Sequence, residues 1–471
     1  MSEISPTGTW SELLWGRNGL RSLALAGGVA LHAINVYIVA TVLPSVVQDI
    51  GGLQYYAWNM TLFVVASIVG SATTPKGIDA LGLRRAFLVA LVVFGLGTGV
   101  CSAAPTMGWM LAGRTLQGLG GGLMLGLSYA SSRILFEQRL WPKAMALLSS
   151  MWGVATLAGP AIGGIFAQMQ AWRWAFGSVI IVTASLALLI VTQISATATT
   201  RSETAVRIPV RQLLLMVVAV LAVSMASLSH NLIWNLAGIV LGITVSVVIA
   251  RIDDVAANRL LPTGAYRLGG DLGSMYACMA LLSVAMTAEI FIPYFLQVVQ
   301  GFSPLAAGYF MVLMSAGWST GSIPSSGRGL VVANRLMQLG PVISSISLLG
   351  LSMALPWYAP DQFSTVVALI GVCLFGIGLG IGITWPHLLT QLFHSSPAGQ
   401  ENMASSAIIT VQLYALAFGA ALGGMVTNAA GFTEPGGLIG SQRAALALLV
   451  ALAMAPACAA FLIRPVIRQR R

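Results

Sequence analysis

The sequence predicts an all-α polytopic membrane protein. Of its 471 residues, 57% are hydrophobic and 8% are charged, whereas soluble domains carry about 25% charged residues. Apolar runs such as residues 86–104 and 363–389 are long enough to cross a bilayer as helices. Basic residues concentrate at the ends of these runs, on one predicted side of the membrane. A single soluble core has no room for this much apolar surface.

The apolar runs predict fourteen spans. The prediction of two spans is weakest at 211–229 and 231–250, which the short turn SLSHN joins. If these two segments form a re-entrant hairpin, the count falls to twelve. The predicted spans are 20–43, 55–74, 86–104, 109–132, 143–168, 173–195, 211–229, 231–250, 273–299, 304–325, 333–356, 363–389, 402–430 and 442–463.

The distribution of charge predicts the orientation. With a cytoplasmic N-terminus, 20 Lys and Arg residues fall in cytoplasmic segments and two, Arg173 and Arg443, fall outside. This asymmetry predicts that both termini are cytoplasmic. The net charge of +10 then reflects topology, and nucleic acid is not an expected partner because the basic residues form no patch with interleaved aromatics.

Several chemistries are disfavoured. The four cysteines lie at wide spacing in apolar runs, so no metal site is expected. The chain has neither an H-E-x-x-H motif nor a phosphate-binding G-x-x-x-x-G-K-[ST] loop, which argues against an intramembrane enzyme and a nucleotide-driven pump. No cofactor is expected. The polar residues 1–20 and the long first apolar run do not resemble a cleavable signal peptide.

The stretch GRTLQGLGGG (113–122) places an arginine inside a predicted span. An arginine at the centre of a spanning helix costs at least about 2.5–3.5 kcal/mol. Helical spacing puts Gln117 and Gly121 on the face of Arg114, and the flanking glycines allow a neighbouring helix to approach. Arg114 either extends to the nearby extracellular end or has an interior role on a ligand or ion pathway, which we favour.

Two further stretches contain residues that are candidates for a role in the conformational change. DALGLRR (79–85), in a predicted cytoplasmic loop, is either an ordinary basic loop or a charge lock between helices; its candidate residues are Asp79, Gly82, Arg84 and Arg85. AGPAIGG (158–164) is either a packing kink or a close helix contact that seals the pathway, because proline weakens a helix and glycine removes side chains. Its candidate residues are Gly159, Pro160, Gly163 and Gly164.

These three stretches, in this order, resemble the signatures of the major facilitator superfamily. AWRWAF (171–176) and IPYFLQVVQGFSPLAAGYF (292–310) resemble its fourteen-span drug:proton antiporter branch. The resemblance implies a central cavity, alternating access and export driven by inward proton flow, with Arg114 in proton coupling and Gly159 and Pro160 in antiport. It also implies two six-helix bundles, and the predicted spans place them at 20–195 and 273–463, which have matching span counts. The remaining segments are an N-terminal segment (1–19), a linker with two extra spans (196–272) and a basic tail (464–471).

The sequence departs from the family's pattern in span 1 and in the loop. Asn35 stands where members often have an aspartate, with His32 one turn earlier. In the loop signature, Pro75 stands where a glycine is usual, and Leu83 stands where a basic residue is usual. In span 5 two expected glycines are alanines, Ala146 and Ala155. These departures remove the usual span-1 proton or cation site and weaken the expected charge lock.

Glu289 is the carboxylate that lies deepest in a predicted span, within SVAMTAEIFIPYFLQ. A carboxyl group there can bind and release a proton as water access alternates, and Pro293 frees a backbone carbonyl nearby. Glu289 is therefore the candidate proton or cationic-substrate site, with Arg114 and His32 as further candidates for proton coupling. The alternative is a neutral glutamate that is hydrogen-bonded between helices.

The leading functional prediction is a proton-coupled exporter of amphipathic small molecules in a bacterial-type inner (plasma) membrane, working as a monomer. Alternatives are an exporter of a specific lipid or endogenous metabolite, and a transport-dead membrane scaffold. The candidate residues of the substrate cavity are Asn35, Gln117, Trp152, Tyr294 and Gln297.

Overall fold

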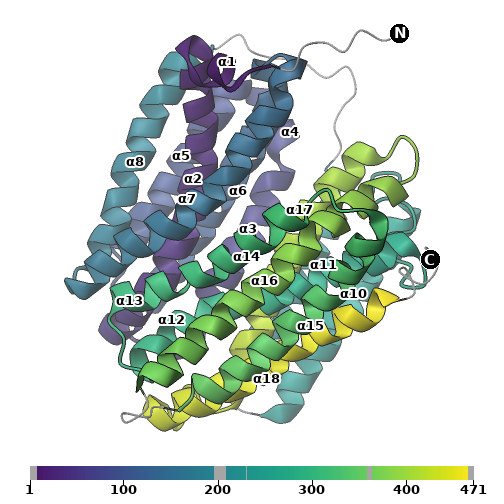
Figure 1. Ribbon diagram of the computed structural model, residues 1–471. Helices are drawn as coiled ribbons and strands as arrows, with labels where there is room; N and C mark the ends of the chain where they lie inside the picture. Colours follow the sequence, from purple (N-terminus) through teal and green to yellow (C-terminus); the bar gives the residue numbers. More distant parts are fainter. Residues whose placement is uncertain (1–7, 196–207, 230, 358–362, 465–471) are drawn as a thin grey trace. The chain divides into compact units, whose positions relative to one another are not determined.

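The protein is helical in a computed structural model, and no β-strand occurs in the described part of the chain (Figure 1). This confirms the all-helical class. The described residues are 8–195, 208–229, 231–357 and 363–464. Outside them lie residues 1–7 of the predicted N-terminal segment, linker residues 196–207, His230 of the SLSHN turn, residues 358–362, and residues 465–471 of the predicted tail.

The chain divides into two compact units. Unit 1 comprises residues 1–51 and 62–208, and unit 2 comprises residues 52–61 and 209–471. Helix α3 (Trp58–Ala72) begins in unit 2 and continues in unit 1. The other helices of unit 1 are α1 (Trp10–Leu14), α2 (Gly16–Ile50), α4 (Thr74–Leu81), α5 (Leu83–Ser102), α6 (Met107–Leu135), α7 (Trp141–Gln168) and α8 (Trp172–Gln193).

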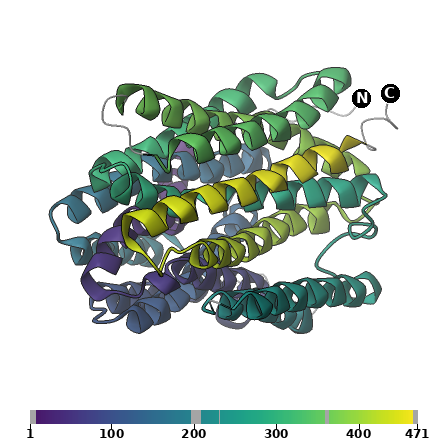
Figure 2. The same ribbon diagram turned by 90° about the horizontal axis from the view of Figure 1, so that it is seen from below.

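The described part of unit 2 contains ten further α-helices. Helices α9 and α10 form a hairpin that packs on α17, and α15 lies between α16 and α18 (Figures 1 and 2). The bounds are α9 (Val210–Ala226), α10 (Leu232–Val255), α11 (Asp271–Met286), α12 (Ala288–Val298), α13 (Pro304–Phe310), α14 (Val312–Ser325), α15 (Leu330–Ala354), α16 (Phe363–Ser395), α17 (Glu401–Ala429) and α18 (Gly437–Leu462).

The predicted count of fourteen spans is not confirmed. Within the described ranges, ten helices are long and apolar enough to cross a membrane, or eleven if Leu53–Ala72 and Thr74–Leu81, bent by 49°, count as one span. The other three predicted spans are helical but fall short of this standard. Helix α6 is long enough but too polar, because it carries Arg114, Gln117 and many glycines; α9 has only 17 residues; and residues 304–325 are divided between α13 and α14.

The interruptions have local causes. Between α11 and α12 the backbone tightens, and the N–H of Thr287 and of Ile290 each donate to the carbonyl three residues earlier. Pro293 removes the N–H that would otherwise pair with the carbonyl of Glu289, since a helical N–H bonds four residues back. Between α3 and α4 the bend coincides with Pro75 in the first turn of α4.

Residues 52–61 are held in unit 2 by an aromatic cluster. The ring of Tyr56, 1% exposed, lies 5.3 Å from Tyr294, 5.7 Å from Phe291 and 5.8 Å from Phe432, measured between centroids. Asn428 donates to the carbonyl of Gln54 at 3.2 Å. Burial of these rings and the hydrogen bond together explain why this short segment belongs to unit 2 although it connects α2 to α3.

A buried carboxylate organises the connection between α10 and α11. Asp253, 0% exposed, accepts hydrogen bonds from the N–H of Leu260 (2.7 Å), the N–H of Leu261 (3.1 Å), the hydroxyl of Tyr266 (3.0 Å) and the amide of Gln212 (3.3 Å). Burial, and then the neighbouring Asp253, raise the pKa of Tyr266 well above its usual range. The hydroxyl therefore stays protonated and remains a donor to Asp253.

Replacing Asp253 with alanine is expected to destabilise this connection, because a buried donor that loses its acceptor costs about 1–3 kcal/mol. The purified variant should melt at a lower temperature and should be cleaved faster by trypsin at Arg259 and Arg267. Asp254→Ala is the matched control, since the neighbouring carboxylate is not fully buried. Equal melting and cleavage of the two variants would contradict the role given to Asp253.

Candidate transport site

Arg114 is fully buried in unit 1, with a relative exposure of 0%. It belongs to the third turn of α6, and its side chain does not extend to a helix end as one alternative predicted. The guanidinium donates to Oδ1 of Asn35 on α2 and, at 2.7 Å, to Oε1 of Gln117 one turn later on α6. Both acceptors are neutral amide oxygens. The predicted contact between Arg114 and Gln117 is therefore present, and Asn35 joins it from another helix.

The polar network continues from α6 to α5. Gln117, 0% exposed, donates from Nε2 to the hydroxyl of Thr98 at 2.9 Å. Thr98 in turn donates to the carbonyl of Phe94 at 2.8 Å. The thiol of Cys101 lies 3.6 Å from Oε1 of Gln117. The amide of Gln117 and the hydroxyl of Thr98 thus have partners in the interior, which lowers the cost of burying the charge of Arg114.

An aromatic ring lies against the same charge, and two further rings follow it. The guanidinium carbon of Arg114 lies 4.1 Å from the centroid of the Phe63 ring, a cation–π contact. His32 of α2, 2% exposed, lies 5.1 Å from Phe63 and 6.1 Å from Trp152, between ring centroids. Nδ1 of His32 has no hydrogen-bond partner. Arg114 and His32 therefore both contact Phe63, Trp152 lies against His32, and Asn35 and Gln117 accept hydrogen bonds from Arg114.

The glycines of α6 allow three helices to pack against it. A Cβ atom at Gly118 or Gly122 would overlap backbone atoms of α3, and one at Gly120 would overlap the backbone of α5. A Cβ atom at Gly121 would lie 2.7 Å from Nδ1 of His32 on α2. Glycine is therefore required on several faces of α6, and it is this close packing that excludes water from Arg114.

The stretch 158–164 makes a close contact between α7 and α2. A Cβ atom at Gly159 would overlap Cβ of Tyr37, and one at Gly163 would lie 2.9 Å from the carbonyl oxygen of Ile38. Pro160 lies inside α7, and Gly164 is buried with it. The contact lies within unit 1. The role of these residues in antiport stays a prediction.

In the loop stretch 79–85, Gly82 ends α4 and precedes α5 with a φ of 75°, a conformation that favours glycine. Among the described residues, no ion pair joins Asp79 to Arg84 or Arg85. A charge lock within this loop is therefore not formed in this conformation. The proposed role of the four residues as a switch stays a prediction.

The candidate residues of unit 2 lie on one short helix, α12. Glu289 occupies its first turn and is partly exposed, and no Lys or Arg of the described chain pairs with it. Its carbonyl is the one that Pro293 leaves without a helical N–H donor. Tyr294 is 8% exposed within the aromatic cluster, whereas Gln297 is partly exposed. Glu289 and Gln297 are thus the more accessible polar groups of this helix.

Phe63 and Thr98 belong to the site but are not among the residues predicted for it. Phe63 is an ordinary aromatic residue in an apolar run, and no local signal marks it. Thr98 is a single polar residue in LVVFGLGTGVC, a weak signal. In the described ranges no group of three or more His, Cys, Asp or Glu side chains is suited to a metal ion.

Comparison with known proteins agrees with this architecture. Residues 25–420 match the sequence profile of the Major Facilitator Superfamily. A probable multidrug-efflux transporter of Mycobacterium tuberculosis is 37% identical over 467 residues, which cover 97% of each chain. Multidrug resistance protein 3 of Bacillus subtilis is 30% identical over 154 residues, which cover 33% of this chain and 30% of that protein.

Solved structures share the fold at low identity. A POT family transporter superposes with a TM-score of 0.64 at 14% identity, covering 95% of this chain and 96% of the other. A D-xylose–proton symporter superposes with a TM-score of 0.63 at 14% identity, covering 93% and 97%. The helical architecture, the ordered signature stretches and the match over most of the chain lead to one conclusion: this protein is a multi-pass membrane transporter that belongs to the major facilitator superfamily.

Proposed function

We propose that the protein exports amphipathic small molecules across the bacterial plasma membrane in exchange for protons. In this proposal bundles 20–195 and 273–463 alternate the access of a central cavity, both termini are cytoplasmic, and the stretches 79–85 and 158–164 serve as switch and antiport elements. The 37% identity to a probable multidrug-efflux transporter over nearly the whole chain supports the export direction.

The observation that carries the proposal is the buried charge of Arg114. Its guanidinium is held by neutral amides of Asn35 and Gln117 and by the face of Phe63. A charge buried among neutral amides and an aromatic ring favours negatively charged or dipolar groups nearby, and it therefore supports a role in binding and coupling as well as in packing. Trp152, 36% exposed, offers an aromatic surface beside this network for a lipophilic substrate.

Proton coupling has two candidate carriers. His32 lies beside Arg114, and in a dry environment the fixed guanidinium charge opposes a second positive charge on the imidazole. Glu289 is partly exposed and lies beside a carbonyl freed by Pro293. A carboxyl group changes from negative to neutral when it binds a proton, so it can alternate between two states without adding positive charge. We therefore propose Glu289 as the proton carrier and Arg114 as the group that tunes the pathway.

The test is efflux of cationic and neutral dyes from pump-deficient cells that express this chain, with and without a protonophore. The proposal predicts efflux that the protonophore abolishes. Proteoliposomes with an imposed pH gradient give the same test without other cellular pumps. If no dye moves although the protein is present in the membrane, lipids and endogenous metabolites become the substrates to test, and absence of flux under every gradient would favour a scaffold.

A further inference from the structure

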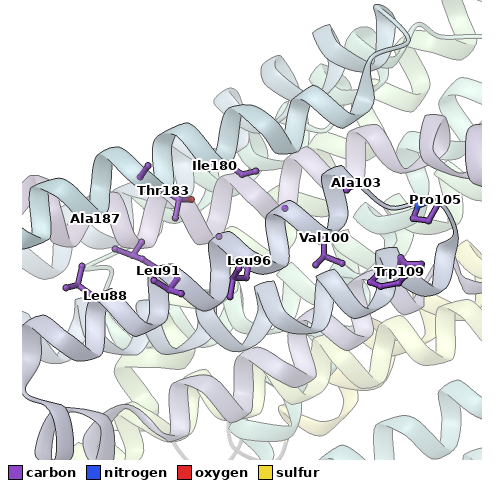
Figure 3. Close-up of a pocket in the computed structure, with 14 residues that line it drawn as sticks. Leu88, Leu91, Leu96, Val100, Ala103, Pro105, Trp109, Ile180, Thr183 and Ala187 are labelled. Atoms are coloured by element: carbon purple, nitrogen blue, oxygen red, sulfur yellow. The ribbon is translucent and has the colours of Figure 1, made fainter.

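An apolar groove of about 760 Å³ runs between α5 and α8 of unit 1. Figure 3 shows Ile180, Thr183 and Ala187 on one side and Leu88, Leu91, Leu96 and Val100 on the other, with Pro105 and Trp109 at one end. Leu96 and Trp109 are 63% and 58% exposed, so the groove is open along its length.

The floor of the groove is lowered by two glycines of α5. A Cβ atom at Gly99 would find no atom within 4 Å, and one at Gly95 would meet only the methyl group of Thr183 at 3.6 Å. The lining residues within α5 run from Leu88 to Val100, which is about 18 Å at 1.5 Å per residue. One leaflet of the hydrocarbon core is about 15 Å thick. The groove is therefore long enough for an acyl chain that lies parallel to the spanning helices.

Away from Trp109 at one end, the lining offers no free polar side chain to a ligand. Thr183 is the one lining residue with a polar side chain apart from Trp109, and its hydroxyl donates to the carbonyl of Val179 within α8 at 2.7 Å. A hydroxyl paired in this way gains nothing from a polar ligand. The chemistry of the lining thus selects a flexible hydrocarbon chain.

Arg84 and Arg85 precede the lining residue Leu88 by one turn of α5 at one end of the groove, and an ion pair lies at the other end, beside Ala103 and Pro105. The carbonyl of Ala104, between the lining residues Ala103 and Pro105, accepts a hydrogen bond from Arg173 at 3.1 Å. Arg173 also pairs with Asp49 at 2.6 Å, and both side chains are about half exposed, at 42% and 47%. An exposed cation beside an exposed carboxylate complements a headgroup that carries both a phosphate and an ammonium group.

We propose that this groove holds the acyl chain of a zwitterionic phospholipid, with its headgroup beside Trp109 and the Arg173–Asp49 pair. Tryptophan and arginine are typical of the membrane–water interface, which agrees with a headgroup at that end. The bound lipid fills the space between α5 and α8 that no side chain of unit 1 fills.

The test uses phosphatidylethanolamine that carries a photoactivatable diazirine in the middle of one acyl chain, with the full chain in nanodiscs. Mass spectrometry of peptides should locate the label on α5 and α8 around Leu96, Val100 and Ile180. Gly99→Phe places a ring in the groove and should lower labelling there about tenfold. This is the loss of affinity expected when about two methylene groups of the acyl chain can no longer be buried in the groove. Val92→Trp, a second exposed lining position, should act in the same way if the first variant folds poorly.

Gly153→Phe is the matched control, because Gly153 of α7 also has no atom within 4 Å of its Cβ position and lies outside the groove. It should be labelled like the unchanged protein. Labelling that is uniform around unit 1, or that survives both groove variants, would overturn the proposal. Competitive loss of the label on addition of an exported dye would also overturn it, since the groove would then be a substrate path.

Discussion

Replacing Arg114 with methionine is expected to lower the initial rate of efflux about 10- to 150-fold. Methionine keeps an unbranched side chain but leaves Oδ1 of Asn35 and Oε1 of Gln117 without their charged donor. Hydrogen bonds to charged groups contribute about 1.5–3 kcal/mol, and about 1.36 kcal/mol corresponds to a tenfold change in rate. The measurement is efflux from proteoliposomes with an imposed pH gradient, normalised to correctly folded protein.

Two further variants separate charge from geometry. Arg114→Lys keeps a positive charge but lacks the planar fork that reaches two amides at once, so partial recovery is expected. Arg133→Met removes an exposed arginine from the last turn of the same helix and should transport normally. If Arg114→Met exports as fast as Arg133→Met, the buried network is only structural and the proposed role of Arg114 is wrong.

Replacing Glu289 with glutamine is expected to uncouple transport. Glutamine has the shape of glutamate but does not ionise, so it has no proton to carry between the two sides. Export of substrate against its concentration gradient, driven by a pH gradient, should be lost. Exchange of labelled substrate on one side for unlabelled substrate on the other should continue, because it needs no pH gradient. Measuring both in the same proteoliposomes distinguishes loss of coupling from loss of folding.

Glu137→Gln is the control for Glu289→Gln. Glu137 is an exposed carboxylate that pairs with Arg139, and an exposed ion pair contributes only about 0–1 kcal/mol, so this variant should remain coupled. Gradient-driven accumulation that persists in Glu289→Gln would exclude Glu289 as the proton carrier. His32 would then be the next residue to replace.

The helical class and most spans were predictable because a bilayer imposes length and apolarity on each crossing helix. The exceptions are informative. Residues 304–325 read as one span but form α13 and α14, and α6 is too polar to pass as a span by itself. The polar residues Arg114 and Gln117 of α6 are buried against neighbouring helices, whereas Leu116 and Leu119 of the same helix are exposed, so packing covers the polar face of a helix that is too polar on average.

The candidate site was predictable only where residues share a helix. The contact between Arg114 and Gln117 follows from their spacing of three residues along α6, so the sequence alone predicts it. Asn35 stood out as a departure from a pattern, but its contact with Arg114 joins residues 79 positions apart. Phe63 carries no local mark at all, although its ring lies against the guanidinium.

The membrane environment, the helical class and the family resemblance follow from the sequence, because apolar length, charge bias and motif order are local properties. The contacts of Arg114 with Asn35 and Phe63, the place of Tyr56 in the aromatic cluster of unit 2, and the hydrogen bonds of Asp253 after α10 become visible only in the folded chain. A buried charge or ring needs partners on other helices, and packing rather than sequence distance selects those partners.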